Sequence, residues 1–242
     1  MSEGSTKPTL REHSPGALAI ALASAAVVAS GARAAFAGSG TLLVYLHVSV
    51  KQRAFQSLLG AGLPGVTTTA VGRIADFERA LKDAPDAVLT LPIVLAAQGL
   101  SPTLRGHARG STEERYALVG AGGAPDPTRV TSVGALDLLG REGTTRFVRR
   151  LVGQQARVER VTKIEDLLPL LQMQRVEAVL LPSRLFPELR AASRLGLAVR
   201  ELDLTVGLPA VASTGPAGAS VLAAISRMPK DVSRLLGVEE WH

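Results

Sequence analysis

Few residues of this 242-residue chain have the types and spacing that catalysis or metal binding requires. It has no cysteine and four histidines, none of them in a close pair, so thiol chemistry and disulfides are excluded and no metal centre is expected. His47 is the histidine in the most informative place, near the carboxyl end of a predicted strand. A lone histidine there is more often structural than catalytic, and nothing organises a nucleophile with a base and an orienting group. We therefore expect no enzyme activity and no cofactor; an exported hydrolase or transferase would need His47 as its base.

Two glycine-rich stretches match nucleotide-binding loops by their letters alone. Gly60-x-Gly62-x-x-Gly65 follows a predicted helix rather than a strand and contains Pro64, which indicates a helix terminator and turn. The stretch 120–123 follows a strand, but no helix opens after it. Walker, HExxH, GxSxG and SxxK patterns do not occur in the sequence.

The charge pattern argues against a nucleic-acid partner. With 27 basic and 21 acidic residues the formal net charge is +6. The densest basic residues, Arg146, Arg149 and Arg150, are followed at a distance by Arg157 and Arg160. Such a spread is typical of a solvated face, since nucleic-acid binding calls for clustered basic residues with stacking aromatics. The positive field can still attract an anionic solute.

The N-terminal segment has the pattern of an export signal. Lys7 and Arg11 precede an apolar run at 17–30, and a small-x-small site follows at 35–37. We predict a signal peptide over residues 1–37 and a periplasmic or secreted mature chain. The apolar run is shorter than the roughly 18 residues that a membrane-spanning helix needs. An uncleaved anchor and an alanine-rich buried helix are the alternatives.

After this segment, strand-like and helix-like stretches alternate, with short connections between them. Asp76 is a candidate helix N-cap, because its carboxylate can accept hydrogen bonds from the first-turn N–H groups. The strands are expected near 41–50, 66–71, 86–91, 103–108, 115–119, 130–139, 157–161, 177–181, 197–206 (one strand or two) and 207–213. The helices are expected near 51–59, 77–83, 92–98, 146–152, 163–174, 187–195 and 219–236, the last as one helix or as two with a kink at Pro229.

This alternation predicts an α/β fold of two lobes, each a mainly parallel sheet flanked by helices. Gly120–Pro127 has the composition of a hinge, and we expect it and the stretch near Gly207 to be the two bridges between the lobes. Ligands of such sheets bind beyond the carboxyl ends of the strands, so both lobes can face one cleft.

The order of segments resembles that of type 2 periplasmic solute-binding proteins, especially the small phosphate/phosphonate-type branch. The resemblance covers about residues 41–240 and lies mostly in layout. The stretches that carry it are DAVLTLP (86–92), ALVGAGG (117–123), GREGTTRFVRRLV (140–152), VEAVLLPSRL (176–185), LPAVAS (208–213) and the closing VLAAISRMPKDVSRLLGVEEW.

The resemblance implies a periplasmic-binding-protein-like fold with two crossover strands. Residues 38–121 plus 207–242 would form lobe 1, and residues 122–206 lobe 2. It implies a monomer that captures a small, anionic, phosphate- or phosphonate-like solute and delivers it to an ABC-type membrane permease.

A hinged pair of lobes that closes on a solute needs polar donors on both walls of its cleft. Thr144 and Thr145 stand near a predicted helix start, where N–H groups and the helix dipole favour an anion, although simple capping explains them equally well. The candidate ligand-binding residues are Ser49, Lys51, Gln52, Thr90, Thr144, Thr145 and Ser183.

The sequence also departs from the family. It has Leu91 and Leu181 where members often present aromatic or polar side chains. An apolar cleft floor leaves open a second function, a non-transport sensor or envelope interaction module on the same fold.

Overall fold

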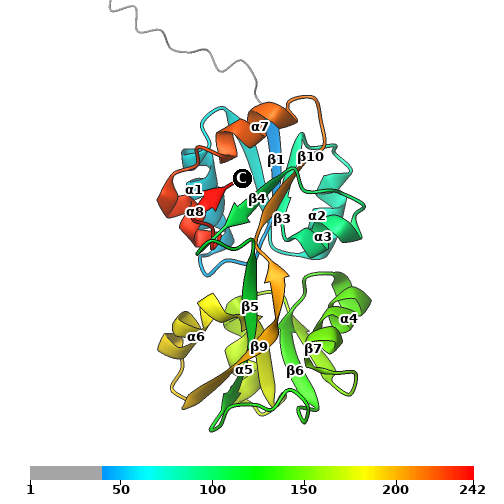
Figure 1. Cartoon of the computed structure of the whole chain (residues 1–242), viewed down its shortest axis with the longest axis vertical. Helices are drawn as coiled ribbons and strands as arrows, with labels where there is room; N and C mark the ends of the chain where they lie inside the picture. Colours follow the sequence, from blue (N-terminus) through cyan, green and yellow to red (C-terminus); the bar gives the residue numbers. More distant parts are fainter. Residues whose placement is uncertain (1–39) are drawn as a thin grey trace, which may run out of the picture. The chain divides into compact units, whose positions relative to one another are not determined.

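The computed structural model describes residues 40–242, so the predicted signal peptide, residues 1–37, lies outside the described residues. Within this range the strands form two sheets, each covered by helices (Figure 1). None of the helices in residues 40–242 is long and apolar enough to cross a membrane.

The first sheet has the strand order β11-β4-β10-β3-β1-β2. Strands β1, β2 and β3 run parallel, and β10, β4 and β11 are antiparallel to their neighbours. Its elements are β1 (Gly40–Tyr45), β2 (Val66–Val71), β3 (Ala87–Thr90), β4 (Leu104–His107), β10 (Ala210–Ser213), β11 (Glu240–Trp241), α1 (Gln52–Gly62), α2 (Ile74–Leu81), α3 (Pro92–Ala97), α7 (Gly218–Ile225) and α8 (Lys230–Leu235).

Strand β1 is apolar on both faces because helices cover both. Leu42 and Val44 belong to one apolar cluster, which includes buried side chains of α1, α7 and α8. Leu43 and Tyr45 point to the other face, where Phe77 of α2 stacks on Tyr45 with 5.1 Å between ring centres. Figure 1 shows α1 and α8 on one side of this sheet and α2 and α3 on the other. A strand buried on both faces is expected for a mainly parallel sheet.

The second sheet has the order β7-β6-β8-β5-β9. Strands β7, β6 and β8 are parallel, and β5 pairs antiparallel with β8 and β9. Its elements are β5 (Glu113–Ala121), β6 (Ser132–Leu136), β7 (Arg157–Val161), β8 (Ala178–Pro182), β9 (Leu197–Gly207), α4 (Gly140–Val152), α5 (Leu167–Gln172), α6 (Phe186–Ala192) and the short 3-10 turns η1 (Ile164–Asp166) and η2 (Ser183–Leu185).

The chain passes between the sheets twice, from β4 to β5 and from β9 to β10. The second passage lies near Gly207, which pairs with Glu113 at the start of β5. The expected bridge at Gly120–Pro127 is wrong, because Gly120 pairs with Ala198 inside the second sheet. The glycines there make a tight strand-end turn instead: Gly122 has a φ of 83°, and a Cβ on Gly120 would meet the Gly123 carbonyl oxygen at 2.9 Å.

The division into lobes at residues 121 and 207 stays a prediction, although in the structure β5, which ends at Ala121, belongs to the second sheet. Below, "first lobe" and "second lobe" mean the two sheets with their helices, as defined above.

Two local expectations are corrected. The first strand was expected to reach residue 50, but β1 ends at Tyr45, level with the last residues of its neighbours, Val71 and Thr90. Beyond that point no strand within residues 40–242 offers β1 a hydrogen-bonding partner. Asp76 is not an N-cap: α2 begins two residues earlier, and the Asp76 carboxylate accepts a 2.6 Å bond from Nε of Arg73.

Candidate functional site

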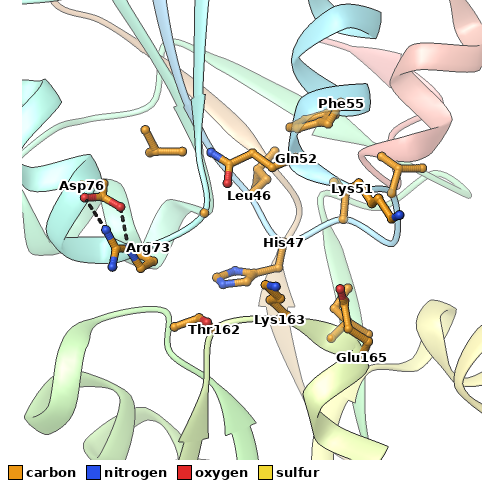
Figure 2. Close-up of a pocket in the computed structure, with 15 residues that line it drawn as sticks. Leu46, His47, Lys51, Gln52, Phe55, Arg73, Asp76, Thr162, Lys163 and Glu165 are labelled. Carbon is orange, nitrogen blue, oxygen red and sulfur yellow. Dashed lines mark hydrogen bonds and ion pairs between the residues drawn. The ribbon is translucent and has the colours of Figure 1, made fainter.

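A cleft lies where the carboxyl ends of the two sets of parallel strands meet. The residues that follow β1 and β2 form one wall, and those that follow β7 form the other. The resulting pocket, which we call the outer pocket, has a volume of about 470 Å³ (Figure 2). It is lined by Leu46, His47, Val48, Val50, Lys51, Gln52, Phe55, Val71, Gly72, Arg73, Asp76, Thr162, Lys163, Ile164 and Glu165.

The outer pocket combines apolar walls with charges from both lobes. Lys51 precedes α1 in the first lobe, while Lys163 and Glu165 follow β7 in the second. Among residues 40–242, neither ammonium group nor the Glu165 carboxylate has an ion-pair or hydrogen-bond partner. Arg73 and Asp76, in contrast, bind each other. Two unpaired cations and one unpaired anion are therefore available to a solute.

His47 lies at the junction of the two lobes. It follows β1, its ring packs edge-on against Tyr45 with 5.4 Å between ring centres, and Figure 2 shows it pointing toward Thr162 and Lys163. Its Nε2 is buried and has no hydrogen-bond partner among the described residues. Burial lowers the pKa of His47 to about 4, although the Asp137 carboxylate acts in the opposite direction. His47 is therefore neutral at physiological pH.

Leu46 and His47 also line a second cavity deeper between the lobes, which we call the inner cavity. Its volume of about 20 Å³ fits one water molecule rather than a solute. Leu91 from the first lobe and Leu136 and Leu138 from the second are among the apolar side chains that fill this space.

An ion pair lies in the inner cavity. Arg184 donates through Nε to Oε2 of Glu114 at 2.9 Å, and both side chains are largely buried. The other carboxylate oxygen, Oε1, has no partner in residues 40–242. Burial raises the pKa of Glu114, and the attraction of Arg184 offsets only part of that effect. Arg184 also lies against the first lobe, since a Cβ on Gly237 would come within 2.6 Å of its Nε.

Direct hydrogen bonds connect the two lobes. The Tyr45 hydroxyl, at the carboxyl end of β1, donates to the Asp137 carbonyl just after β6 at 2.6 Å. Ser49 donates to the Glu188 carboxylate of α6 at 3.3 Å. The structure therefore has the two lobes in contact.

Three of the predicted site residues line these cavities. Lys51 and Gln52 line the outer pocket, and Thr90 lines the inner cavity. Two of the three already have intramolecular partners: Gln52 donates to the Ala70 carbonyl at 2.8 Å, and Thr90 donates to the Tyr45 carbonyl at 2.6 Å. Lys51 is thus the predicted residue in the outer pocket whose side chain makes no hydrogen bond or ion pair within residues 40–242.

The remaining predicted residues lie elsewhere. Helix α4 begins at Gly140, so Thr144 and Thr145 lie in its second turn rather than at its start. The fully buried Thr144 donates to the Asp137 carboxylate at 2.9 Å and accepts from the Leu139 N–H at 2.9 Å. Thr145 donates to the Arg141 carbonyl at 2.7 Å. These contacts fit a structural role for both threonines.

Ser49 and Ser183 lie at the lobe junction but outside the lining of either cavity. Ser49 makes the contact with Glu188 described above, and the Ser183 hydroxyl, at the end of β8, is buried without a partner in the described residues. Whether these side chains contact a solute stays a prediction.

Sequence reasoning did not identify Lys163, Glu114 or Arg184 as site residues. Lys163 and Arg184 each stand two residues beyond the end of a parallel strand, and that spacing was an available signal. Glu114 belongs to a crossing strand whose start was placed at residue 115, so its position offered no comparable signal. Within residues 40–242 no group of three or more potential metal ligands occurs.

Comparison with known proteins identifies the fold. No family model and no curated protein sequence matches the chain. Among solved structures, the Bordetella pertussis BvgS VFT2 domain is similar with a TM-score of 0.54 at 14% identity, over 82% of this chain and 91% of that one. The GluR0 ligand-binding core in complex with L-glutamate gives 0.53 at 14%, over 82% and 96%. A substrate-binding protein of an amino acid ABC transporter gives 0.50 at 12%, over 82% and 92%.

At these identities the similarity is one of fold alone. It agrees with the two sheets, the two crossing strands and the cleft at the carboxyl ends. The predicted fold class is therefore confirmed: the described part of the chain has the two-lobed fold of type 2 periplasmic binding proteins and Venus flytrap domains.

Proposed function

We propose that the chain is an exported solute-binding protein that captures a small solute carrying an anionic group in the outer pocket. The observation that supports this most directly is the pair of unpartnered ammonium groups, Lys51 and Lys163, which reach one pocket from opposite lobes. A solute that contacts both cations stabilises lobe closure, because it gains the second contact only when the lobes are together.

The pocket favours a carboxylate solute with an apolar part over inorganic phosphate. Val48, Val50 and Phe55 supply apolar surface, and the free Glu165 carboxylate would repel a compact dianion while accepting an ammonium group. Two of the similar structures are described as a glutamate complex and an amino acid transporter component, which fits this choice. Phosphate and phosphonate stay in the test as the ligands that the sequence predicts.

The test is a thermal-shift and calorimetry screen of the purified chain. The solutes are amino acids, small organic acids, phosphate, phosphonates and sulfate. A solute at a hundredfold excess over Kd stabilises the folded state by about 2.7 kcal/mol. For a solute that binds, Lys51→Ala and Lys163→Ala should each weaken affinity about tenfold, the equivalent of about 1.4 kcal/mol. Lys230→Ala, an exposed lysine at the start of α8 outside the pocket, is the control.

The absence of any shift across the panel would contradict the proposal. Equal affinity in Lys51→Ala, Lys163→Ala and Lys230→Ala would also contradict it, because the solute would then bind outside the outer pocket. If the chain serves transport, its partner would be an ABC-type membrane permease that receives the solute. A reconstituted permease whose ATPase activity increases when the solute-loaded chain is added would support that role.

A second function, a non-transport sensor or envelope interaction module, is favoured by the inner cavity. Leucines and the Glu114–Arg184 pair fill that space, and the Tyr45 hydroxyl contacts the other lobe directly. This alternative predicts no thermal shift from any solute, together with direct binding of an envelope protein to the solute-free chain.

A further inference from the structure

A second groove lies in the second lobe, away from the cleft. It has a volume of about 460 Å³ and runs between α4 and β7. We call it the arginine groove. It is lined by Arg141, Thr145, Arg149, Gln155, Arg157, Val158, Glu159 and Arg160.

The helix side of the groove follows from sequence spacing. Arg141, Thr145 and Arg149 are four residues apart along α4, so their side chains share one face of the helix. Arg157 and Arg160 come from β7, the strand that follows α4 in the chain. The lining of the groove thus includes four arginines, two from α4 and two from β7.

The groove is strongly positive. Four arginines face a single carboxylate, that of Glu159, which already pairs with Arg157 at 3.5 Å and with Arg175 outside the groove at 3.5 Å. Arg160 is paired with Asp137 at 2.5 Å. The Arg141 guanidinium group has no ion-pair or hydrogen-bond partner among the described residues. The groove therefore retains unneutralised positive charge.

Backbone carbonyls already hold two of these guanidinium groups in place. Arg149 donates through Nε to the Ala156 carbonyl at 3.1 Å, and Arg157 donates through Nη2 to the Arg175 carbonyl at 3.0 Å. Each bond uses one N–H and leaves others of the planar group available for carboxylate oxygens. Groups that are ordered in advance lose less entropy on binding.

The strand side of the groove is an open sheet edge. Within the described residues β7 pairs only with β6 and stands at the end of the sheet. Arg157 donates its backbone N–H to Thr131 on the inner side at 2.7 Å. Because the backbone N–H and C=O groups of successive residues in a parallel strand point to alternate sides, those of Val158 and Arg160 point to the open side. An open edge can bind an extended segment of another chain, and flanking charges restrict which segments fit.

The length of the groove selects an elongated ligand. Arg141 and Arg149 are separated by eight positions, or about 12 Å along a helix, and the five residues of β7 extend about 16 Å. A single small oxyanion cannot contact both ends. We propose that the arginine groove binds an extended acidic polypeptide segment of a partner protein, which lies along β7 and directs carboxylates to the arginines.

The test measures fluorescence anisotropy of a labelled peptide of alternating Glu and Val with the full chain. We expect binding that weakens as salt increases, and no binding of the matched Gln–Val peptide. Arg141→Ala should weaken binding about threefold to fivefold, and the double variant Arg141→Glu, Arg157→Glu at least tenfold. Arg190→Glu, an exposed arginine of α6 in the same lobe, is the control and should leave affinity unchanged. Arg141 is exposed, and Arg141→Ala removes no side-chain hydrogen bond or ion pair within residues 40–242.

Further binding measurements distinguish an acidic peptide from other ligands of the groove. Equal binding of the Glu–Val and Gln–Val peptides would overturn the proposal, as would unchanged affinity in both groove variants. Binding of inorganic phosphate or of anionic phospholipid vesicles, with no binding of the acidic peptide, would also overturn it. An acidic peptide with proline at alternate positions cannot complete the strand ladder, and its binding as tightly as Glu–Val would refute alignment along β7.

Discussion

Acidification should destabilise the chain through His47. The folded state holds this side chain with a pKa of about 4, whereas an unfolded histidine titrates near 6.5. Between these values the unfolded state binds more protons, so the free energy of unfolding decreases as pH falls and is fully retained above about pH 6.5. The two pKa values give a loss of about 2 kcal/mol at pH 5 from His47 alone.

The assay is urea unfolding between pH 5 and pH 7.5, comparing the wild-type chain with His47→Gln. Carboxylates that titrate in this range are present in both chains, so the difference between the two pH profiles isolates His47. The wild-type chain should lose about 2 kcal/mol more than the variant on going to pH 5.

Parallel profiles for the wild type and His47→Gln would refute the reasoning. They would mean that His47 gains a proton in the folded state at no cost, which is incompatible with a buried, unpartnered Nε2 at the lobe junction.

Two further changes test the contact between the lobes. Tyr45→Phe removes the hydroxyl that donates to the Asp137 carbonyl and should lower the free energy of unfolding in urea by about 1 kcal/mol. It should also weaken the contact between the lobes, which solution scattering would detect as an increased radius of gyration. An unchanged stability and an unchanged radius of gyration would contradict a role for this bond. Gly237→Ala places a Cβ at a φ of 75° and within 2.6 Å of Nε of Arg184. It should destabilise the fold by about 1 kcal/mol or more, which corresponds to a melting temperature lower by several degrees. Gly196→Ala, where a Cβ meets nothing within 4 Å, is the control and should leave the melting temperature unchanged.

Local sequence determined most of the secondary structure. The predicted second strand, 66–71, matches β2 in full, and the break at Pro229 separates α7 from α8. These features depend on side-chain periodicity and on the restricted backbone of proline and glycine, which act within a few residues. Helix α1 extends three residues beyond its predicted end at residue 59, so Gly60 and Gly62 lie inside it, and the turn comes at Gly65, which has a φ of 82°.

The passage between the lobes was harder to place, because composition does not distinguish a hinge from a turn. Gly120–Pro127 has the residues of a linker, yet the pairing of Gly120 with Ala198 fixes it inside the second sheet. That pairing joins strands far apart in the chain, and no local pattern contains it.

The candidate site depended on tertiary structure in the same way. The sequence alone determined that polar and charged residues follow the carboxyl ends of parallel strands, which is how Lys51 was found. Only the fold decided that Lys163 lines the same pocket, that the Thr144 hydroxyl donates to Asp137 and that the His47 Nε2 is buried at the lobe junction. The approximate position of each strand follows from local propensity, whereas strand ends such as that of β1 and the facing of two sheets depend on long-range pairing and packing, and the chemistry of a cleft depends on both.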